Sequence, residues 1–528
     1  MPNPRVPADE LPIVPIPVAA RRLEGVFKLG TDVVIRHDAA AAPEARRLAE
    51  FLDQRLGKAP KLRKGGGSSS RAIALAVDPS VGAVAGAYQL VATPDGVRIA
   101  GKDRAGVFHG IVTLLQLCPP VGDVRWSDPE GAPVIAAKID DAPAFAWRGL
   151  QYDAGRWFLP AKDIRTLIDW MAFHKLNVFH WHLTEDQGWR FESRKYPKLT
   201  ETGAWRASSP RYGDRNASDG KRHGGYYTQR ECRDIVRYAA ERHITVVPEV
   251  EIPGHSSAAI ASYPQFGNTD VPGFAPKVVE KWGVQSYTYA PKPETLRFLD
   301  DILGEICDVF PSTYIHIGGD EAPKSQWKAS AYAQDFMKRN GLKNEDELQS
   351  WFIRQAEGML SKRGRRLIGW DEIREGGLSP NATVMAWRSE QWGIDTVKEG
   401  KDIVMAPTSH MYLDYYQDDP KRELAKGAEY ECIGGYLPIE KVYSYHPIPD
   451  ALTPAEALKV LGVEAEVWGE YVKSIEKATY LAFPRAAAVA EIGWSPRARR
   501  DFAGFTVRLR ALEAHYRAGG LKYGRIPS

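Results

Sequence analysis

The chain of 528 residues is longer than one ordinary hydrophobic core serves, and its 44% hydrophobic and 26% charged residues are typical of a globular protein with two domains. Its 70 basic and 67 acidic residues leave a net charge of only +3, which argues against a nucleic-acid or membrane-surface partner. The four cysteines are widely spaced and no apolar run has the length of a membrane span, which argues against a disulfide framework, a cysteine metal site and a transmembrane segment.

The N-terminal region, residues 1–142, alternates short strand-like and helix-like segments. It starts without a basic stretch followed by an apolar one, so we expect no signal peptide in this sequence. A chain from which a signal peptide had been removed would look the same, so the sequence does not predict the cellular compartment. The patterns predict strands at 33–36 and 72–77 and helices at 45–56 and 106–117. No cluster of polar side chains suited to catalysis occurs in this region. We interpret residues 1–142 as a small non-catalytic α/β domain.

Residues 143–528 follow a different pattern, in which strand-like segments alternate with helical ones. The strand-like segments are 147–153, 177–184, 244–250, 314–320, 366–370, 383–388, 402–407 and 460–468. Between most of them, apolar residues recur with helical spacing, as over 164–171 and 296–309. Eight such repeats predict a (β/α)8 TIM barrel as the catalytic domain. The alternative is a doubly wound open sheet, but no glycine-rich dinucleotide fingerprint follows the first strand.

Polar and aromatic residues gather at the ends of the predicted strands, where TIM-barrel enzymes carry their chemistry. These residues are Asp153, Arg156, His180, His182, Thr184, Asp186, Glu249, Glu251, His255, Asp320, Glu321, Trp370, Asp371, Glu372, Trp387, Arg388, Tyr412, Asp414, Trp468 and Glu470. Each alone has an ordinary structural explanation, but packing would not place acids, an arginine and tryptophans together at eight strand ends. Carboxylates and arginine suit sugar hydroxyls, and tryptophan faces suit sugar rings. A paired acid among them is what cleavage of a glycosidic bond requires.

The acid pair follows a short strand-like run, YIHIGGDE, at residues 314–321. On a continuous strand the adjacent side chains of Asp320 and Glu321 would face opposite ways, so both reach one site only if the chain turns. Gly318 and Gly319 permit that turn. We expect burial to raise the pKa of whichever carboxyl group protonates the leaving oxygen.

Several motifs in this region resemble those of the glycoside hydrolase family 20 β-N-acetylhexosaminidases. They are HIGGDE (316–321), HWHLTEDQGWR (180–190), IPGH (252–255), VWGEY (467–471), DAGRWFLP (153–160), WDEI (370–373) and YLD (412–414). The resemblance covers residues 147–500, and residues 1–142 match the family's preceding domain only in pattern. It implies an exo-acting, retaining enzyme that removes terminal β-linked GlcNAc or GalNAc from an oligosaccharide or glycoconjugate.

Catalysis in that family is substrate-assisted, because the acetamido group of the substrate makes the first attack and forms an oxazolinium intermediate. The resemblance implies that Glu321 is the general acid and base, and that Asp320 orients the acetamido group. It also implies that Tyr412 donates a hydrogen bond to the acetamido oxygen and that Asp186 and His255 form a relay behind Glu321.

The resemblance further implies a set of substrate-binding residues. These are Trp370, Trp387 and Trp468 around the ring and the acetamido methyl group, and Arg156, Asp414 and Glu470 on the hydroxyl groups. The family has two aspartates in some members where this chain has Glu185 followed by Asp186, which leaves a contribution of Glu185 open. The long segments 203–225 and 264–292 are expected at the mouth, where they would set the preference for the leaving side.

Two other functions remain as alternatives. One is a metal-dependent barrel hydrolase that uses His180, His182 and His255, since two histidines one residue apart on a strand share a face. The other is a sugar-binding protein without catalysis, which the presence of both acids makes less attractive. Our main hypothesis includes no cofactor and no metal. The natural glycan and the oligomeric state are not predicted.

Overall fold

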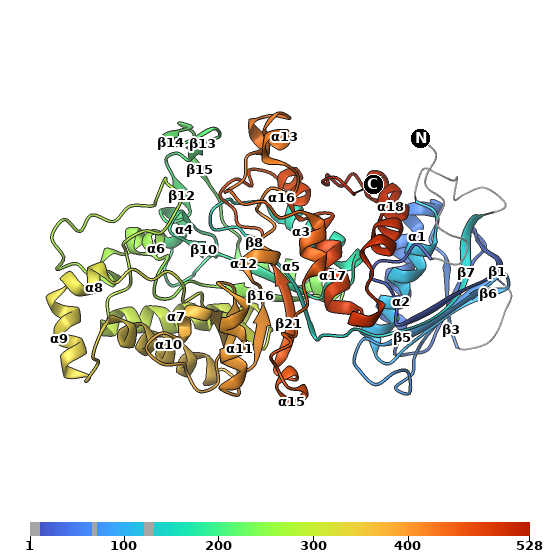
Figure 1. Cartoon of the computed structure of the whole chain (residues 1–528), viewed down its shortest axis with the longest axis horizontal. Coiled ribbons are helices and arrows are strands. Elements are labelled where there is room, and N and C mark those ends of the chain that lie inside the picture. The colour runs from blue at the N-terminus through green and yellow to red at the C-terminus, as the bar shows by residue number, and fades with distance from the viewer. Residues whose placement is uncertain (1–10, 66–70, 121–130, 528) are drawn as a thin grey trace.

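The computed structural model describes residues 11–65, 71–120 and 131–527, and it combines a seven-stranded sheet with a closed barrel (Figure 1). The sheet has the order β1-β7-β5-β6-β4-β2-β3 and contains both parallel and antiparallel neighbours. Its strands are β1 (Ala19–Leu29), β2 (Val34–His37), β3 (Lys61–Lys64), β4 (Ala72–Val77), β5 (Tyr88–Thr93), β6 (Gly96–Gly101) and β7 (Ala132–Asp141). Helices α1 (Ala42–Leu56) and α2 (Arg104–Leu117) lie between this sheet and the barrel (Figure 1). The two strands and two helices predicted here are confirmed.

The sheet and the barrel share buried contacts. Phe108 and Val112 of α2 belong to the same hydrophobic cluster as the barrel helices. Next to them, the buried ammonium group of Lys175 donates to Tyr88 Oη at 3.0 Å and lies 3.3 Å from Asp141 Oδ2. Such a charge is tolerated in the interior only when it is paired and hydrogen-bonded, so these contacts fix the sheet against the barrel.

All eight predicted strands form a closed parallel barrel in the order β16-β17-β18-β19-β20-β21-β8-β9, which confirms the predicted (β/α)8 fold. The strands are β8 (Trp147–Asp153), β9 (Val178–His182), β16 (Thr245–Glu249), β17 (Tyr314–His316), β18 (Arg366–Trp370), β19 (Thr383–Ala386), β20 (Ile403–Met405) and β21 (Val460–Ala465). Small hairpins stand outside the barrel: β10 (Thr184–Glu185) with β11 (Gly188–Trp189), β12 (Trp205–Arg206) with β15 (His223–Gly224), and β13 (Pro210–Arg211) with β14 (Asp214–Ser218).

Helices surround the barrel, and the two apolar stripes predicted over 164–171 and 296–309 are buried in α3 and α7. The longer ones are α3 (Ala161–Phe173), α5 (Gln229–Ala240), α7 (Pro293–Val309), α9 (Ala331–Arg339), α10 (Glu345–Ser361), α11 (Glu390–Lys398), α16 (Ile475–Ala482), α17 (Arg485–Trp494) and α18 (Phe502–Ala518). Shorter helices are α4 (Lys198–Glu201), α6 (Ser257–Ser262), α8 (Ser325–Ala329), α12 (Thr408–Met411), α13 (Pro420–Leu424), α14 (Ile439–Ser444) and α15 (Pro454–Ala457). Only the 3-10 turn η2 (Asp371–Arg374) connects β18 to β19. None of the described helices combines the length and the apolar character needed to cross a bilayer.

The barrel interior is polar towards the carboxyl ends of its strands. His180 lies between Glu249 Oε2, at 2.9 Å from its Nε2, and Glu464 Oε1, at 2.8 Å from its Nδ1. His316 Nδ1 lies 2.8 Å from Glu249 Oε1, and all four side chains are fully buried. Burial alone would lower the pKa of His180, but the two carboxylates raise it to about 10. This charged layer is the floor beneath the cavity described next.

Candidate active site

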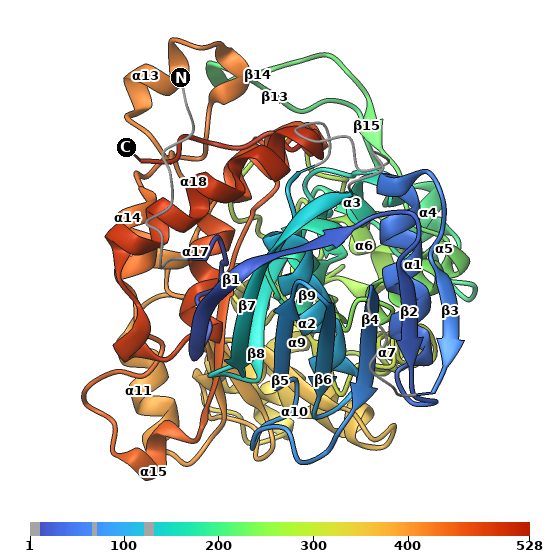
Figure 2. The same ribbon diagram turned by 90° about the vertical axis from the view of Figure 1, so that its right-hand side faces the viewer.

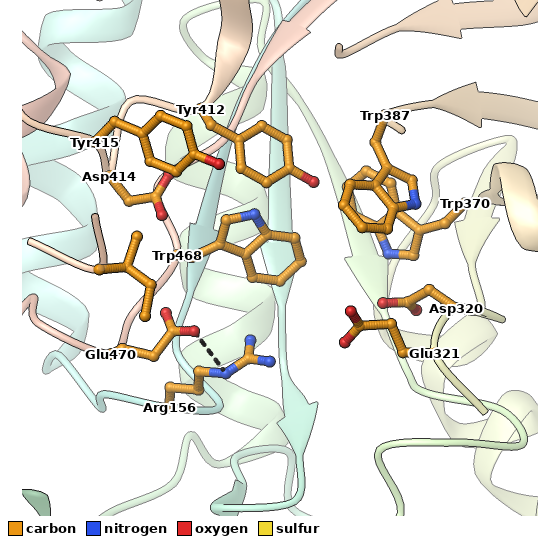
Figure 3. Close-up of a pocket in the computed structure, with 11 residues that line it drawn as sticks. Arg156, Asp320, Glu321, Trp370, Trp387, Tyr412, Asp414, Tyr415, Trp468 and Glu470 are labelled. Atoms are coloured by element: carbon orange, nitrogen blue, oxygen red, sulfur yellow. Dashed lines mark ion pairs between the residues drawn. The ribbon is translucent and has the colours of Figure 1, made fainter. Parts of the chain in front are cut away.

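A cavity of about 160 Å³ opens at the carboxyl ends of the barrel strands (Figure 3). It is lined by Arg156, Asp320, Glu321, Trp370, Trp387, Tyr412, Asp414, Tyr415, Ile433, Trp468 and Glu470. Nine of these eleven were proposed from the sequence, and the structure brings them together from six of the strands. Their individual roles stay predictions.

The backbone after β17 places both acids in the cavity. The strand ends at His316, four residues earlier than predicted, because Gly318 (φ 64°) and Gly319 (φ 89°) adopt left-handed conformations. A Cβ atom at Gly318 would fall 1.8 Å from a carboxylate oxygen of the loop after β16, so only glycine fits. Glu321 is itself left-handed (φ 42°), a strained conformation of the kind that functional sites maintain. The side chains of Asp320 and Glu321 consequently point to the same side (Figure 3).

Behind the acid pair lies His255, which contacts four carboxylates. Its Nε2 lies 3.5 Å from Asp320 Oδ2 and 3.5 Å from Glu321 Oε2. Its Nδ1 lies 2.8 Å from Glu185 Oε1 and 3.2 Å from Asp186 Oδ2. The structure thus brings the predicted pair of Asp186 and His255 behind Glu321, and it adds Glu185, which contacts the imidazole more closely.

The pKa of Glu321 shifts in the direction opposite to our expectation. Burial alone would lower the pKa of His255, but the carboxylates around it, Glu185 foremost, hold it well above the usual value. The resulting imidazolium contacts Glu321 and lowers the pKa of that carboxyl group below 4.5, despite a smaller opposing effect of burial. Our expectation of a raised pKa from burial was wrong because the side chain of Glu321 is 39% exposed and faces a cation.

Arg156 organises the opposite end of the cavity. Its guanidinium group lies 3.0 Å from Asp153 Oδ2, 3.4 Å from Glu185 Oε2 and 3.5 Å from Glu470 Oε1, and its Cζ lies 5.2 Å from the ring centre of Trp468 (Figure 3). It is buried, so these partners hold its charge in a fixed position.

Several buried polar atoms around the cavity have no protein hydrogen-bond partner among the described residues. They are Asp320 Oδ1, Asp414 Oδ1, Trp468 Nε1 and Glu470 Oε2. Burial raises the pKa of Asp414 well above its usual range and also raises that of Glu470, and their proximity to each other adds to the shift of Asp414. Leaving a buried polar group unpaired costs about 1–3 kcal/mol, so this wall suits a ligand rich in hydroxyl and amide groups.

Aromatic rings form the remaining walls, and hydrogen bonds fix two of them. Trp370 Nε1 donates to Glu249 Oε1 at 2.9 Å, and Trp387 Nε1 donates to Glu372 Oε2 at 2.8 Å. The ring of Tyr412 is nearly parallel to that of Trp387, with centroids 6.0 Å apart. Its hydroxyl group points into the cavity (Figure 3), and burial raises its pKa well above 10, so it stays protonated and able to donate.

Sequence reasoning missed Tyr415, Ile433 and a role for Glu372. Tyr415 follows Asp414 directly, but it was not among the residues selected at the strand ends. Ile433 lies in an irregular segment and offered no signal. Glu372 was noted at a strand end without a role; burial, and after it the charges of Asp320 and Asp371, raise its pKa to about 9, so it is neutral at pH 7.

The histidines of the metal-dependent alternative do not converge. His182 lies between Asp153 and Glu251, at 3.1 and 3.0 Å. Within the described part of the chain, His180 and His255 share no carboxylate partner with each other, although His182 also lies 3.5 Å from Glu249, a partner of His180. The groups of possible ligands found in the described residues are His180 with Glu249 and His316, His180 with Glu464 and Glu466, His182 with Glu249 and Glu251, Glu185 with Asp186 and His255, and His255 with Asp320 and Glu321. None of these groups contains all three histidines.

Comparison with known families agrees with this geometry. The profile of "Glycosyl hydrolase family 20, catalytic domain" matches residues 145–497, and "Glycosyl hydrolase family 20, domain 2" matches residues 10–142. The chain belongs to glycosyl hydrolase family 20. Membership of this family confirms the resemblance and favours it over the two alternatives.

Relatives within family 20 are similar over most of the chain. A beta-hexosaminidase of Porphyromonas gingivalis is 44% identical over 502 residues, which cover 94% of this chain, and the chain spans 62% of the length of that relative. Among solved structures, the family 20 exo beta-N-acetylglucosaminidase of Vibrio harveyi, in complex with N-acetylglucosamine, has a TM-score of 0.85 at 29% identity and covers 99% of this chain and 80% of its own. The N-acetyl-beta-hexosaminidase of Streptomyces plicatus, in complex with Thio-NAglucal, has a TM-score of 0.79 at 31% identity, with 98% and 97% covered.

Proposed function

We propose that this family 20 protein is an exo-acting, retaining β-N-acetylhexosaminidase, which removes terminal, non-reducing β-linked GlcNAc or GalNAc. The observation that carries the proposal is the placement of two adjacent carboxylates, Asp320 and Glu321, opposite the hydroxyl group of Tyr412 in one aromatic-walled cavity. The names of the relatives support it, since a beta-hexosaminidase and an exo beta-N-acetylglucosaminidase are among them.

The reaction begins when the acetamido oxygen of the substrate attacks C1 and the bond from C1 to the leaving oxygen breaks. Glu321 delivers a proton to that oxygen. Asp320 accepts a hydrogen bond from the acetamido N–H, and its negative charge offsets the positive charge that develops on the ring. Tyr412 donates its hydroxyl hydrogen to the acetamido oxygen. Glu321 then removes a proton from water, which attacks C1 and reopens the oxazolinium ring, so that the configuration at C1 is retained.

The lowered pKa of Glu321 is compatible with acid catalysis because His255 holds a proton 3.5 Å away. A charged imidazole beside a carboxylate and a neutral imidazole beside a carboxylic acid contain the same number of protons. The proton that leaves through Glu321 is therefore the one that this pair holds in common, and Glu185 and Asp186 keep it there at neutral pH.

The opposite end of the cavity would hold the hydroxyl groups of the terminal sugar. Arg156 donates, the carboxyl groups of Asp414 and Glu470 accept, and the face of Trp468 lies beneath the ring. These groups form the wall of the cavity on the side away from Glu321, which supports an exo-acting enzyme that holds one terminal sugar there. Trp370 and Trp387 would enclose the acetamido methyl group.

The division into domains forms part of the proposal. We assign residues 1–142 to a non-catalytic α/β domain and residues 143–528 to the catalytic barrel. The end of β7 at Asp141 and the start of β8 at Trp147 support this boundary, as do the ranges that the two profiles match.

The test is hydrolysis of matched chromogenic β-glycosides of N-acetylglucosamine, N-acetylgalactosamine and glucose, with and without a chelator. We expect turnover of both N-acetylated substrates, insensitivity to the chelator, and inhibition by a thiazoline that mimics the ring-closed intermediate. Equal turnover of the glucoside would refute substrate assistance, and chelator-sensitive activity would revive the metal-dependent alternative. A panel of chito-oligosaccharides and glycoprotein glycans would then define the natural substrate.

A further inference from the structure

The two segments predicted to insert at the mouth, 203–225 and 264–292, are markedly basic. Together they contain eight lysine or arginine residues and four aspartate or glutamate residues, whereas the whole chain of 528 residues has a net charge of +3. The cavity itself is rich in carboxylates. Positive charge is therefore concentrated beside an acidic site rather than spread over the molecule, and such a concentration favours an anionic ligand.

The basic residues of the two segments meet in a cleft of about 390 Å³. One side is the β13–β14 hairpin, with Arg215, and the other is the loop that contains Lys277 and Lys281. In both views the β13–β14 hairpin projects on the same side of the molecule as α13 (Figures 1 and 2). The lining contains one acid, Glu280, whose carboxylate accepts a hydrogen bond from Ser208 Oγ. We call this the basic cleft.

The basic cleft is backed by the residues behind the catalytic acid. The Val279 amide donates to the Asp186 carbonyl oxygen at 3.1 Å, and Ser256 Oγ, from the residue after His255, donates to the carbonyl oxygen of Tyr287 at 3.2 Å. Both Val279 and Tyr287 line the cleft. Through these two hydrogen bonds the basic cleft adjoins the backbone of the relay behind Glu321, the group that would protonate the leaving oxygen.

The cations of the cleft are available to a ligand. Arg215, Lys277 and Lys281 are exposed, and none has a carboxylate partner within 4 Å among the described residues. In contrast, the basic Arg206 of the same region is buried and donates to backbone carbonyl groups. Three exposed cations without carboxylate partners around one concave surface give it a positive potential, which attracts an anionic ligand.

A second pocket, on the Trp157 side of the same hairpin, is also lined mainly by basic residues. It is lined by Trp157, Arg211, Tyr212, Asp219, Lys221, Arg222, His223 and Lys473. Burial lowers the pKa of His223 to about 2, so its charge does not add to that of the four cations. The positive potential therefore extends along both sides of the hairpin.

We propose that the basic cleft binds an acidic group, a carboxylate or a sulfate ester, on the leaving side of the substrate. The preferred substrates are then oligosaccharides in which a terminal β-N-acetylhexosamine precedes an acidic sugar, such as a uronate. This inference rests on the proposed function, since it assigns the leaving-side specificity of that same site.

The test compares four substrates of equal length. They are an N-acetylhexosaminyl-uronate trisaccharide, the same trisaccharide with its carboxyl group reduced to an alcohol, and chitotriose, the last also in a form sulfated on its second sugar. The full-length protein is compared with a triple variant, Arg215→Gln, Lys277→Gln and Lys281→Gln. A control variant, Arg230→Gln, Lys338→Gln and Lys362→Gln, changes the net charge equally on exposed residues of the outer surface.

In the triple variant we expect kcat/KM for the acidic trisaccharide to fall about tenfold, mainly through KM, because exposed charge pairs contribute modestly and bind ground and transition states alike. The carboxyl-reduced trisaccharide should lose less than about twofold, and the control variant should behave as the parent. The preference for the acidic substrate should weaken with added salt. A larger effect on the sulfated chitotriose than on the uronate would identify the acidic group as a sulfate.

Equal losses on acidic and reduced substrates, or no loss on any, would overturn the inference. The proposed function fails separately, because it requires that the parent protein cleave the neutral chitotriose whatever the cleft binds.

Discussion

His255 contacts Glu321 through Nε2, and Glu185 and Asp186 through Nδ1. These contacts predict where enzyme activity is lost at alkaline pH, which can be measured. If the imidazole and Glu321 hold one proton in common, loss of that proton abolishes acid catalysis, and the alkaline limb of kcat/KM reports its pKa. Carboxylates hold the pKa of His255 well above 6.5, so the limb of the parent enzyme should lie well above neutral pH. Asp186→Asn removes one negative charge while keeping the shape of the side chain, and it should move the limb to lower pH.

The size of the shift follows from the contact that is lost. Asp186 Oδ2 lies 3.2 Å from His255 Nδ1, and both side chains are fully or almost fully buried, so solvent weakens their interaction little. A hydrogen bond to a charged group contributes about 1.5–3 kcal/mol, and one pKa unit corresponds to about 1.4 kcal/mol. The alkaline limb of Asp186→Asn should therefore lie about 1–2 pH units below that of the parent. Glu185→Gln should shift it at least as far, because Glu185 Oε1 is closer, at 2.8 Å.

The assay is kcat/KM from pH 4 to about 10 on a substrate with a poor leaving group, for which protonation matters most. Ser257→Ala is the matched control. Ser257 donates two hydrogen bonds to Asp186 Oδ1, one from its backbone amide and one from its hydroxyl group. The substitution removes the second bond but leaves the negative charges of Glu185 and Asp186 beside His255. A uniform loss of rate in Asp186→Asn with an unmoved alkaline limb would refute the reasoning, and Asp186 would then have only a structural role.

Four further substitutions separate the roles within the cavity. Glu321→Gln should lower kcat about 10²–10⁴-fold on chito-oligosaccharides and much less on nitrophenyl substrates, whose leaving groups need little protonation; equal losses on both would contradict its role as the acid. Asp320→Asn should cost about 10²–10³-fold on either substrate, because it acts on the positive charge of the intermediate, and dependence on the leaving group would show the two roles to be misassigned. Tyr412→Phe should reduce kcat about 10–100-fold with KM nearly unchanged, and a rise in KM alone would mean that its hydroxyl group only binds the substrate. Glu372→Gln should change kcat little at pH 7, because Glu372 has a pKa of about 9 and is already neutral there; a large loss would show that it works as an anion.

The barrel could be predicted from the sequence because its signals are local. Each strand is a short apolar run, and each long helix repeats apolar residues at a spacing that buries one face, as in α3 and α7. The lengths were less accurate: β17 was expected to reach residue 320, yet it ends at His316. Strand propensity continues through the apolar Ile317, but two successive glycines in left-handed conformations turn the chain and end the strand.

The cavity was predictable only where its residues follow a strand. Trp370 is the last residue of β18, and Asp320 and Trp468 lie three or four residues beyond the ends of β17 and β21, so the barrel rule places all three in the site. Ile433 reaches the cavity from an irregular segment, so no periodic pattern identifies it. The pKa of Glu321 was beyond sequence reasoning for a related reason. Its direction depends on His255, which lies 66 positions earlier in the chain and which other carboxylates keep charged.

The charge distribution explains how the site can favour both a cationic intermediate and an acidic substrate. Four carboxylates, from Glu185, Asp186, Asp320 and Glu321, surround the single imidazole of His255, so negative charge remains where the oxazolinium ion would form. The same negative charge would repel an acidic sugar from the cavity. The cations of the basic cleft lie on the other side of the relay, so an acidic oligosaccharide would meet attraction only with its neutral N-acetylhexosamine inward. Opposite charges at the two ends of the scissile bond thus orient the substrate before any hydroxyl group is recognised.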